Sequence, residues 1–97
     1  MRRWGFIYTL GDDQAEVRRD VIGSAACELV CVGIPSVEGA AAAARTLLED
    51  GVELIELCGA FEAKGLAAVV AEVDGAIPAG AAFYGGEAAT GLHRLFG

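Results

Sequence analysis

The feature that most constrains the fold is a fourfold alternation between short apolar runs and segments with helical spacing. Apolar runs at residues 3–9, 27–32, 52–57 and 81–84 are followed by helical segments at 13–22, 37–50, 62–74 and about 86–96. Strand–helix repeats with short connections form parallel strands joined by right-handed crossovers. We therefore expect one α/β domain over residues 1–97, with a four-stranded parallel sheet and alternating helices.

Two layouts fit this alternation. One is a flavodoxin-like open sheet, with strand order 2-1-3-4 and helices on both faces. The other is a half-barrel with strand order 1-2-3-4 and helices on one face only, which must pair through its other face. We favour the open sheet, because nearly continuous apolar strands suit burial on both faces.

The size of the chain predicts assembly with further copies. The chain has 97 residues and is 55% hydrophobic, but alanine supplies much of that fraction and buries little area. So small a domain removes only part of its surface from water when it folds. We therefore expect a homo-oligomer, a dimer or larger, that covers a sheet face or edge.

The net charge and the cysteine content indicate which classes of partner and which cell compartment to expect. A net charge of −7 with scattered basic residues argues against nucleic acid and against anionic membrane surfaces. No apolar run approaches the roughly 18 residues of a membrane span, and the apolar start of the chain is too short for a signal peptide. Three cysteines, an odd number, fit a reducing compartment, so we expect a cytoplasmic protein.

Several ligand classes lack their motifs. No glycine-rich phosphate-binding motif follows the first predicted strand, where the residues from Thr9 to Asp13 form an acidic turn instead. His93 is the only histidine, and the cysteines do not form a C-x-x-C pair. We expect neither a metal site nor a cofactor.

Glu56 is the first candidate catalytic residue. On a strand, Val52, Leu54, Glu56 and Cys58 share one face, which places a carboxylate among apolar neighbours. Burial raises the pKa of a carboxyl group, as general acid–base chemistry requires. The alternative is a structural Glu56 that is held by backbone N–H groups, an arginine or a subunit contact.

Cys58 is the second candidate catalytic residue. It stands at the carboxyl end of the same predicted strand, just before Gly59 and the start of a helix. Oriented amides at that position lower the pKa of a thiol and make it nucleophilic. The alternative, a small buried side chain that fills core space, is the commoner role of cysteine.

The turn Tyr84-Gly85-Gly86-Glu87 supplies candidate ligand-binding residues. The two glycines let backbone amides face a ligand, and the N-terminus of the following helix favours an anion. Glu87 already brings a negative charge there, so a tight turn with an acidic first residue is the competing interpretation. Tyr8, at the corresponding end of the first strand, adds a phenol to the same edge.

These residues predict a site for a small polar metabolite at the carboxyl end of the strands. The leading hypothesis is a cofactor-free acid–base enzyme of the isomerase, lyase or cyclase type. The alternative is a non-catalytic ligand-binding or oligomerising accessory protein that uses the same crevice.

Three segments carry a resemblance to a known family. These are Trp4-Gly5-Phe6-Ile7-Tyr8, the run Leu54-Ile55-Glu56-Leu57-Cys58-Gly59-Ala60-Phe61, and Tyr84-Gly85-Gly86-Glu87. With them, nearly the whole chain resembles a family of small bacterial proteins that is classed as a domain of unknown function. The resemblance implies a bacterial origin and assigns no catalytic role.

Overall fold

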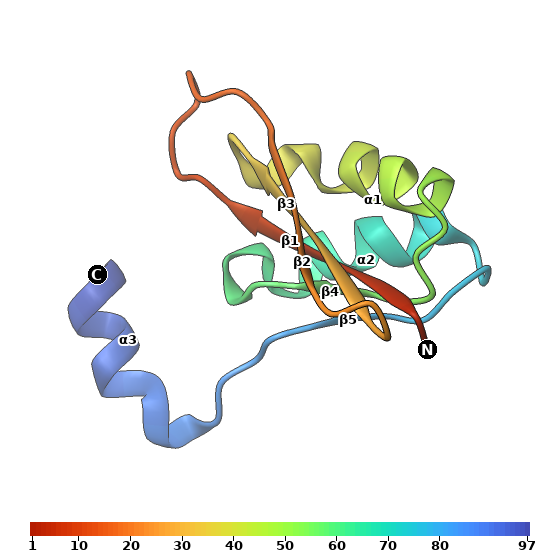
Figure 1. The fold of residues 1–97 in the computed structure, drawn as a ribbon. Helices are drawn as coiled ribbons and strands as arrows, with labels where there is room; N and C mark the ends of the chain where they lie inside the picture. The colour runs from red at the N-terminus through yellow and green to blue at the C-terminus, as the bar shows by residue number, and fades with distance from the viewer.

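A computed structural model of the protein describes all residues 1–97 as a five-stranded sheet with two helices packed on it and a third helix apart (Figure 1). The elements in chain order are β1 (Arg3–Thr9), β2 (Arg18–Gly23), β3 (Glu28–Ile34), the 3₁₀ turn η1 (Val37–Gly39), α1 (Ala40–Glu49), β4 (Ile55–Leu57), the 3₁₀ turn η2 (Gly59–Phe61), α2 (Glu62–Val73), β5 (Ala79–Ala81), the 3₁₀ turn η3 (Gly86–Ala88) and α3 (Ala89–Phe96). None of these helices has the length and apolarity needed to cross a lipid bilayer.

The strand order confirms the α/β prediction and much of the expected layout. The order is β2-β3-β1-β4-β5, and the four strands β3, β1, β4 and β5 are mutually parallel. These four correspond to the four predicted strands, and their order is the flavodoxin-like 2-1-3-4. The fifth strand, β2, joins the edge antiparallel to β3.

The helix predicted over residues 13–22 is wrong, because the second half of this segment, residues 18–22, lies in β2. Strand β2 pairs with β3 from Arg18 opposite Gly33 to Gly23 opposite Glu28. The hairpin turn is closed by the backbone N–H of Ser24, which donates to the carbonyl of Cys27 at 3.0 Å. Gly23 adopts φ +112°, a conformation that favours glycine, and it reads as the turn residue of a hairpin and not as the end of a helix.

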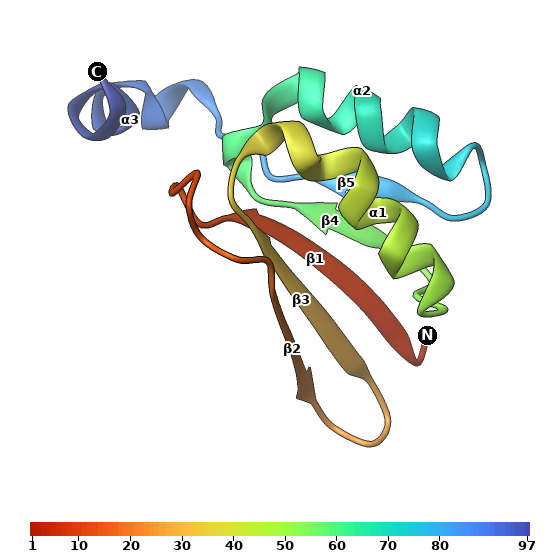
Figure 2. The ribbon, with the colours of Figure 1, turned by 90° about the horizontal axis from the view of Figure 1, so that it is seen from above.

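This hairpin explains why only one face of the sheet is covered by helices, as Figure 2 shows. Helix α1 crosses from β3 over β1 to β4, and α2 crosses in the same direction from β4 to β5, so right-handed crossovers place both on one face. The segment that would have formed a helix over the other face is β2. The expectation of helices on both faces is therefore wrong.

The core lies between the covered face and the two helices. The sheet contributes Ile7, Val30, Ile55 and Leu57, none of which exposes any surface. The helices contribute chiefly Ala43, Ala44, Leu47, Val69 and Val73. Gly5 lets α1 approach closely, since a Cβ at this position would lie 2.8 Å from Cδ1 of Leu47.

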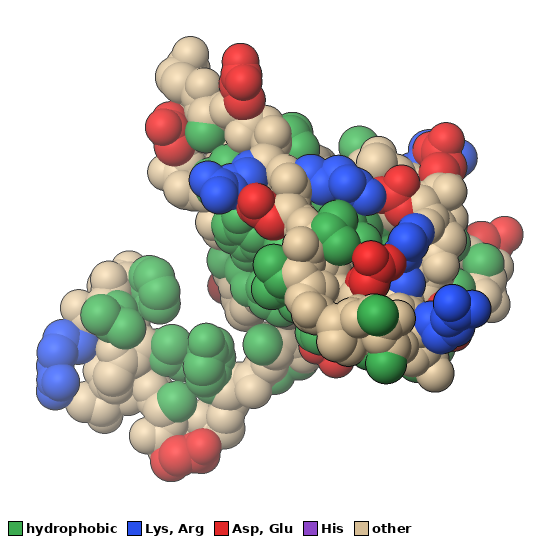
Figure 3. All heavy atoms as spheres, viewed as in Figure 1, with side chains coloured by type: hydrophobic (Ala, Val, Ile, Leu, Met, Phe, Trp, Pro, Cys, Tyr) green, Lys and Arg blue, Asp and Glu red, His purple; other side chains and the backbone are tan.

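The opposite face of the sheet, which we call the open face, is also largely apolar. Its side chains come from alternate positions of the strands and are half-buried or exposed. They include Ile22, Leu29, Cys31, Trp4, Phe6, Tyr8 and Glu56. The Phe6 and Tyr8 rings stack with centroids 6.5 Å apart. Figure 3 views the molecule from this side and shows a hydrophobic patch on it.

Helix α3 projects from the body beyond the carboxyl ends of the strands (Figures 1 and 2). Its apolar residues Leu92, Leu95 and Phe96 continue a helical spacing that begins at Ala88 in η3. Leu95 is 74% exposed and Phe96 82% exposed, and no α3 residue is buried. The helix therefore contributes nothing to the core of its own chain.

Candidate functional site

The carboxyl edge of the sheet brings Tyr8 and Cys58 together. The backbone N–H of Cys58 donates to the carbonyl of Ile7 at 3.0 Å, which extends the β1–β4 ladder one residue beyond Leu57. Tyr8 and Cys58 are therefore neighbours across two strands, at the edge of the open face. The Cys58 side chain is half-buried and has no hydrogen-bond partner.

Two tyrosine rings pack against glycines at this edge. A Cβ built on Gly33 would lie 2.6–2.8 Å from ring atoms of Tyr8. A Cβ on Gly59 would lie 2.9 Å from Cε2 of Tyr84 and 3.4 Å from the carbonyl oxygen of Ala82. Each glycine thus leaves room for a ring, and the second contact fixes the segment after β5 against the turn after β4.

A pocket of about 670 Å³ opens beside the second contact. It lies between η2, the start of α2, the segment after β5 and one side of α3. Its lining is mainly apolar and consists of Gly59, Ala60, Glu62, Ala82, Phe83, Tyr84, Leu92, His93 and Phe96. This pocket is the candidate functional site.

Glu62 reaches the pocket from an unusual backbone conformation. Its φ of +55° lies in a region that favours glycine, although Glu62 begins α2 directly after η2. Non-glycine residues in such conformations are strained and cluster at binding sites. Glu62, His93 and the Tyr84 hydroxyl are the polar groups of a pocket whose remaining side chains are apolar.

Of the ligand-binding residues expected from the sequence, only Tyr84 lines the pocket. Gly85 and Gly86 follow it, but the carboxylate of Glu87 folds back against Gly85, within contact of a Cβ placed there. Glu87 thus brings a negative charge to the turn where an anionic ligand was expected. Tyr8 lies outside the pocket lining.

The expected burial of Glu56 is wrong. Strand β4 covers only residues 55–57, and its core positions are Ile55 and Leu57, so Glu56 points to the open face and is exposed. It lies between Phe6 and Gly80 in the sheet register and makes no hydrogen bond or ion pair within the chain. The prediction that Glu56 shares a buried face with Val52 and Leu54 is wrong because both residues lie before β4, where side chains do not alternate between the two faces of the sheet.

The pocket residues that sequence reasoning missed are Glu62, Phe83, His93 and Phe96. His93 is exposed and shares the pocket side of α3 with Phe96, three positions later. The sequence does show the i, i+3 spacing that places His93 and Phe96 on one side of a helix. It does not show that residues 82–85 direct this helix back toward η2, so it could not indicate that this side lines a pocket.

The cysteines are not paired with one another. All three cysteines are free, and burial, helped by the charge of Asp20, raises the pKa of the Cys31 thiol on the open face. The protein has no group of three or more histidine, cysteine, aspartate or glutamate side chains that could hold a metal ion.

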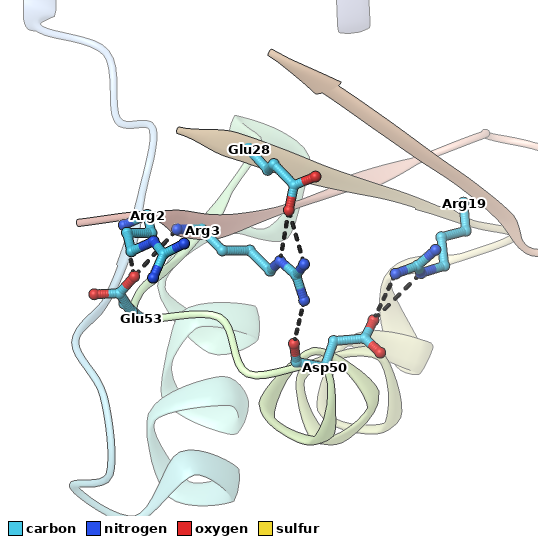
Figure 4. A network of polar contacts seen from close by, with 6 residues as sticks. All are labelled: Arg2, Arg3, Arg19, Glu28, Asp50 and Glu53. Atoms are coloured by element: carbon cyan, nitrogen blue, oxygen red, sulfur yellow. Dashed lines mark hydrogen bonds and ion pairs between the residues drawn. The ribbon is translucent and has the colours of Figure 1, made fainter. Parts of the chain in front are cut away.

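A polar network occupies the opposite, amino end of the strands (Figure 4). Arg3 donates from Nε and Nη2 to Glu28 at 3.0 and 2.7 Å and from Nη1 to the backbone carbonyl of Asp50 at 2.8 Å. Arg19 of β2 pairs with the Asp50 carboxylate at 3.1 Å. Because these bonds tie β1, β2 and β3 to the end of α1, the network is structural.

Glu53 in this network predicts a pH dependence of stability. Its carboxylate accepts the backbone N–H groups of Arg2 at 2.6 Å and Arg3 at 3.1 Å, which lower its pKa below the usual value. The stabilisation is therefore complete above the unfolded pKa of about 4.3 and is lost as the pH falls through the lower folded pKa. Glu53→Gln should lower stability at pH 7 and flatten its decline toward pH 3.

Urea unfolding at pH 7, 5 and 3 measures this effect. Glu49→Gln is the matched control, because Glu49 is exposed and makes no hydrogen bond. If the stability of Glu53→Gln falls with pH as steeply as that of the parent, the Glu53 bonds do not persist in solution.

The fold and the pocket define a small α/β domain with one covered face, one open face and a pocket at the carboxyl edge of its sheet. The sequence model of a family of unknown function, DUF6506, matches residues 2–97, and the chain belongs to this family. No match was found among curated proteins or among solved structures.

Proposed function

We propose that the protein is a small-molecule-binding domain whose ligand occupies the pocket beside Tyr84. The observation that carries this proposal is the pocket itself, about 670 Å³ at the carboxyl edge of a largely parallel sheet. Binding sites for small molecules have volumes of about 300–1,000 Å³ and a mainly apolar lining with a few polar groups. In open α/β sheets, ligands bind beyond the carboxyl ends of the strands.

The lining favours an aromatic or otherwise apolar molecule with one neutral or basic polar group. Phe83, Tyr84 and Phe96 present rings, and Glu62 presents a carboxylate that accepts a hydrogen bond from an amine or hydroxyl. A net charge of −7 and the nearby Glu87 disfavour an anionic ligand. The polar group of the expected metabolite is thus held by Glu62, and its apolar part by the rings.

Acid–base catalysis by Glu56 is not part of this proposal. Glu56 is exposed on the open face, and neither it nor Cys58 lines the pocket. An exposed carboxylate lacks the desolvation on which general acid–base catalysis relies. We therefore propose ligand binding in the pocket and no catalytic role for Glu56.

Native mass spectrometry of the protein purified from its own cells tests the proposal. We expect a bound small molecule in the parent, and a loss of at least about tenfold in affinity in Tyr84→Ala, which removes the ring that faces the pocket. Glu56→Gln is the matched control and should retain the ligand. Finding no bound molecule, and no thermal stabilisation by a panel of aromatic amines and alcohols, would contradict the proposal, as would full binding by Tyr84→Ala.

A further inference from the structure

Two apolar surfaces of this chain have no partner within it. One is the open face, where Trp4, Phe6 and Leu29 remain half-buried while α1 and α2 cover the other side of the sheet. The other is the stripe of α3 formed by Leu92, Leu95 and Phe96. Exposed patches of this kind on a small domain mark interaction surfaces.

Helix α3 requires a surface to pack on. Isolated helices of fewer than about 12–15 residues are marginal in water, and α3 has eight residues. Its stripe is mostly exposed, with Leu95 at 74% and Phe96 at 82%. The extended shape agrees, because the radius of gyration is 13.8 Å, against about 12.5 Å expected for a compact chain of this length.

The open face of the same chain is out of reach of α3. The backbone N–H of Ala82 donates to the carbonyl of Leu57 at 2.9 Å, and the Tyr84 ring packs on Gly59. These contacts hold the connection at the carboxyl edge, and Figure 2 shows α3 on the side of the sheet where α1 and α2 lie. To cover its own open face, α3 would have to break both contacts and pass around the edge of the sheet.

We propose that the protein forms a two-fold symmetric dimer in which α3 of each copy packs on the open face of the other copy. A second copy supplies the sheet face that α3 lacks and the helix that the open face lacks. Both contacts form at once in a closed pair, as isologous association requires. Figure 3 shows hydrophobic side chains on the body and on α3, and those of α3 lie mainly on the side of the helix that faces the body.

The dimensions of the two surfaces match. A helix of eight residues is about 12 Å long, and three or four strands span about 10–14 Å across a sheet. Three large apolar side chains per helix bury on the order of 400 Å². Two helices and the two faces beneath them then bury about 1,600 Å² in total, the size of a stable protein–protein interface.

The charges also match. The ionisable side chains of α3 are His93 and Arg94, and α3 carries no acidic residue. On the open face, Asp20 is paired with Arg18 at 2.7 Å, which leaves the carboxylate of Glu56 unpaired. A basic helix therefore meets a face with a net negative charge, which favours this docking modestly in a solvent-exposed setting.

This dimer shares two residues with the proposed ligand site, because Leu92 and Phe96 of the α3 stripe also line the pocket. Tyr84 and Glu62, which define the pocket, belong neither to the open face nor to the α3 stripe. Leu95, by contrast, belongs to the α3 stripe and does not line the pocket, so Leu95→Asp tests the dimer without changing the pocket lining. Failure of the dimer and failure of ligand binding are thus distinguished by different variants.

Light scattering after size-exclusion chromatography, at about 50 µM protein, tests the assembly. The chain has a mass of 9.9 kDa, and we expect the parent to elute at twice that mass. Leu95→Asp on α3 and Phe6→Asp on the open face should each yield monomers, whereas Val17→Asp, at a position 62% exposed outside both surfaces, should stay dimeric. A monomeric parent, or a dimer that survives Leu95→Asp, overturns the proposal. Because Leu95 lies outside the core, this variant stays informative even if Phe6→Asp fails to fold.

A cross-linking experiment identifies which copy provides the helix. In a background with Cys27→Ser and Cys58→Ser, the native Cys31 marks the open face, and Gly91→Cys marks α3 at a position without neighbours within 4 Å. A short bismaleimide should join two chains and give a covalent dimer. A link within a single chain shows that α3 covers its own sheet, and the absence of any link shows that α3 does not reach the open face; either result overturns the proposal.

Discussion

Leu47→Ala is expected to lower the free energy of unfolding by about 2–5 kcal/mol. Leu47 exposes no surface and packs from α1 onto β1, where Gly5 provides no side chain to fill the space left behind. The loss is a large part of the 5–15 kcal/mol that stabilises a typical domain. Urea unfolding at a fixed protein concentration measures it, and Val70→Ala on the exposed side of α2 should change stability much less.

A second substitution shows whether the cavity is responsible. Gly5→Ala should destabilise the parent, because its Cβ would lie 2.8 Å from Leu47 Cδ1. In the Leu47→Ala background the same methyl enters the vacated space and should recover part of the loss. Additive effects of the two substitutions would show that α1 does not pack on Gly5 as described.

The second large effect is expected for Gly23→Val, which should destabilise the protein by about 1–3 kcal/mol or more. Gly23 has φ +112°, and a Cβ there would lie 2.5 Å from the backbone carbonyl oxygen of Cys27. That oxygen accepts the hydrogen bond that closes the β2–β3 turn, so it cannot move without loss of the bond. Loss of the turn should release β2 and show as faster amide hydrogen exchange in β2 and β3.

Gly11→Ala is the matched control for this prediction. Gly11 also has a positive φ, +66°, but a Cβ there meets nothing within 4 Å. Gly11→Ala therefore introduces the backbone strain without the steric contact, and it should lower the free energy of unfolding less than Gly23→Val does. Equal losses in the two variants would mean that the Cys27 carbonyl does not limit Gly23.

The strands and helices that were predicted correctly are those whose apolar residues follow a regular spacing within a single segment of the chain. The first strand was predicted over residues 3–9 and is β1, and the helix predicted over 37–50 is η1 followed by α1. Both have long, regular periodicity, and α1 ends beside Gly51, a typical helix stop.

The part that failed depends on pairing that no local pattern reveals. Residues 18–22 are charged at three of five positions, which suits an exposed helix as well as an edge strand. What decides between them is the ladder with β3 and the ion pair between Arg19 and Asp50, 31 residues away. A helix at residues 13–22 would have covered the open face, so this wrong helix also led to the wrong expectation that helices cover both faces.

The pocket lies at the edge of the sheet where the sequence predicts a site, but most of its lining differs from the predicted residues. Parallel strands bring their carboxyl ends together, so Tyr84 could be placed there from the strand order alone. Glu56 was misplaced because a three-residue strand leaves too little alternation to fix which face a side chain takes. His93 could not be assigned, since its position follows from the path of residues 82–85.

The register of the sheet also sets the order in which the chain can assemble. Strand β1 is made first, yet it lies in the centre of the sheet and pairs with Ile55, 50 residues later. The β2–β3 hairpin needs only its own short turn, and hairpins close within microseconds. Loop-closure entropy delays pairings between distant residues, so β1 must wait for β3 and then β4. We therefore expect the hairpin, which includes the edge strand absent from the expected layout, to form before β1 pairs in the sheet.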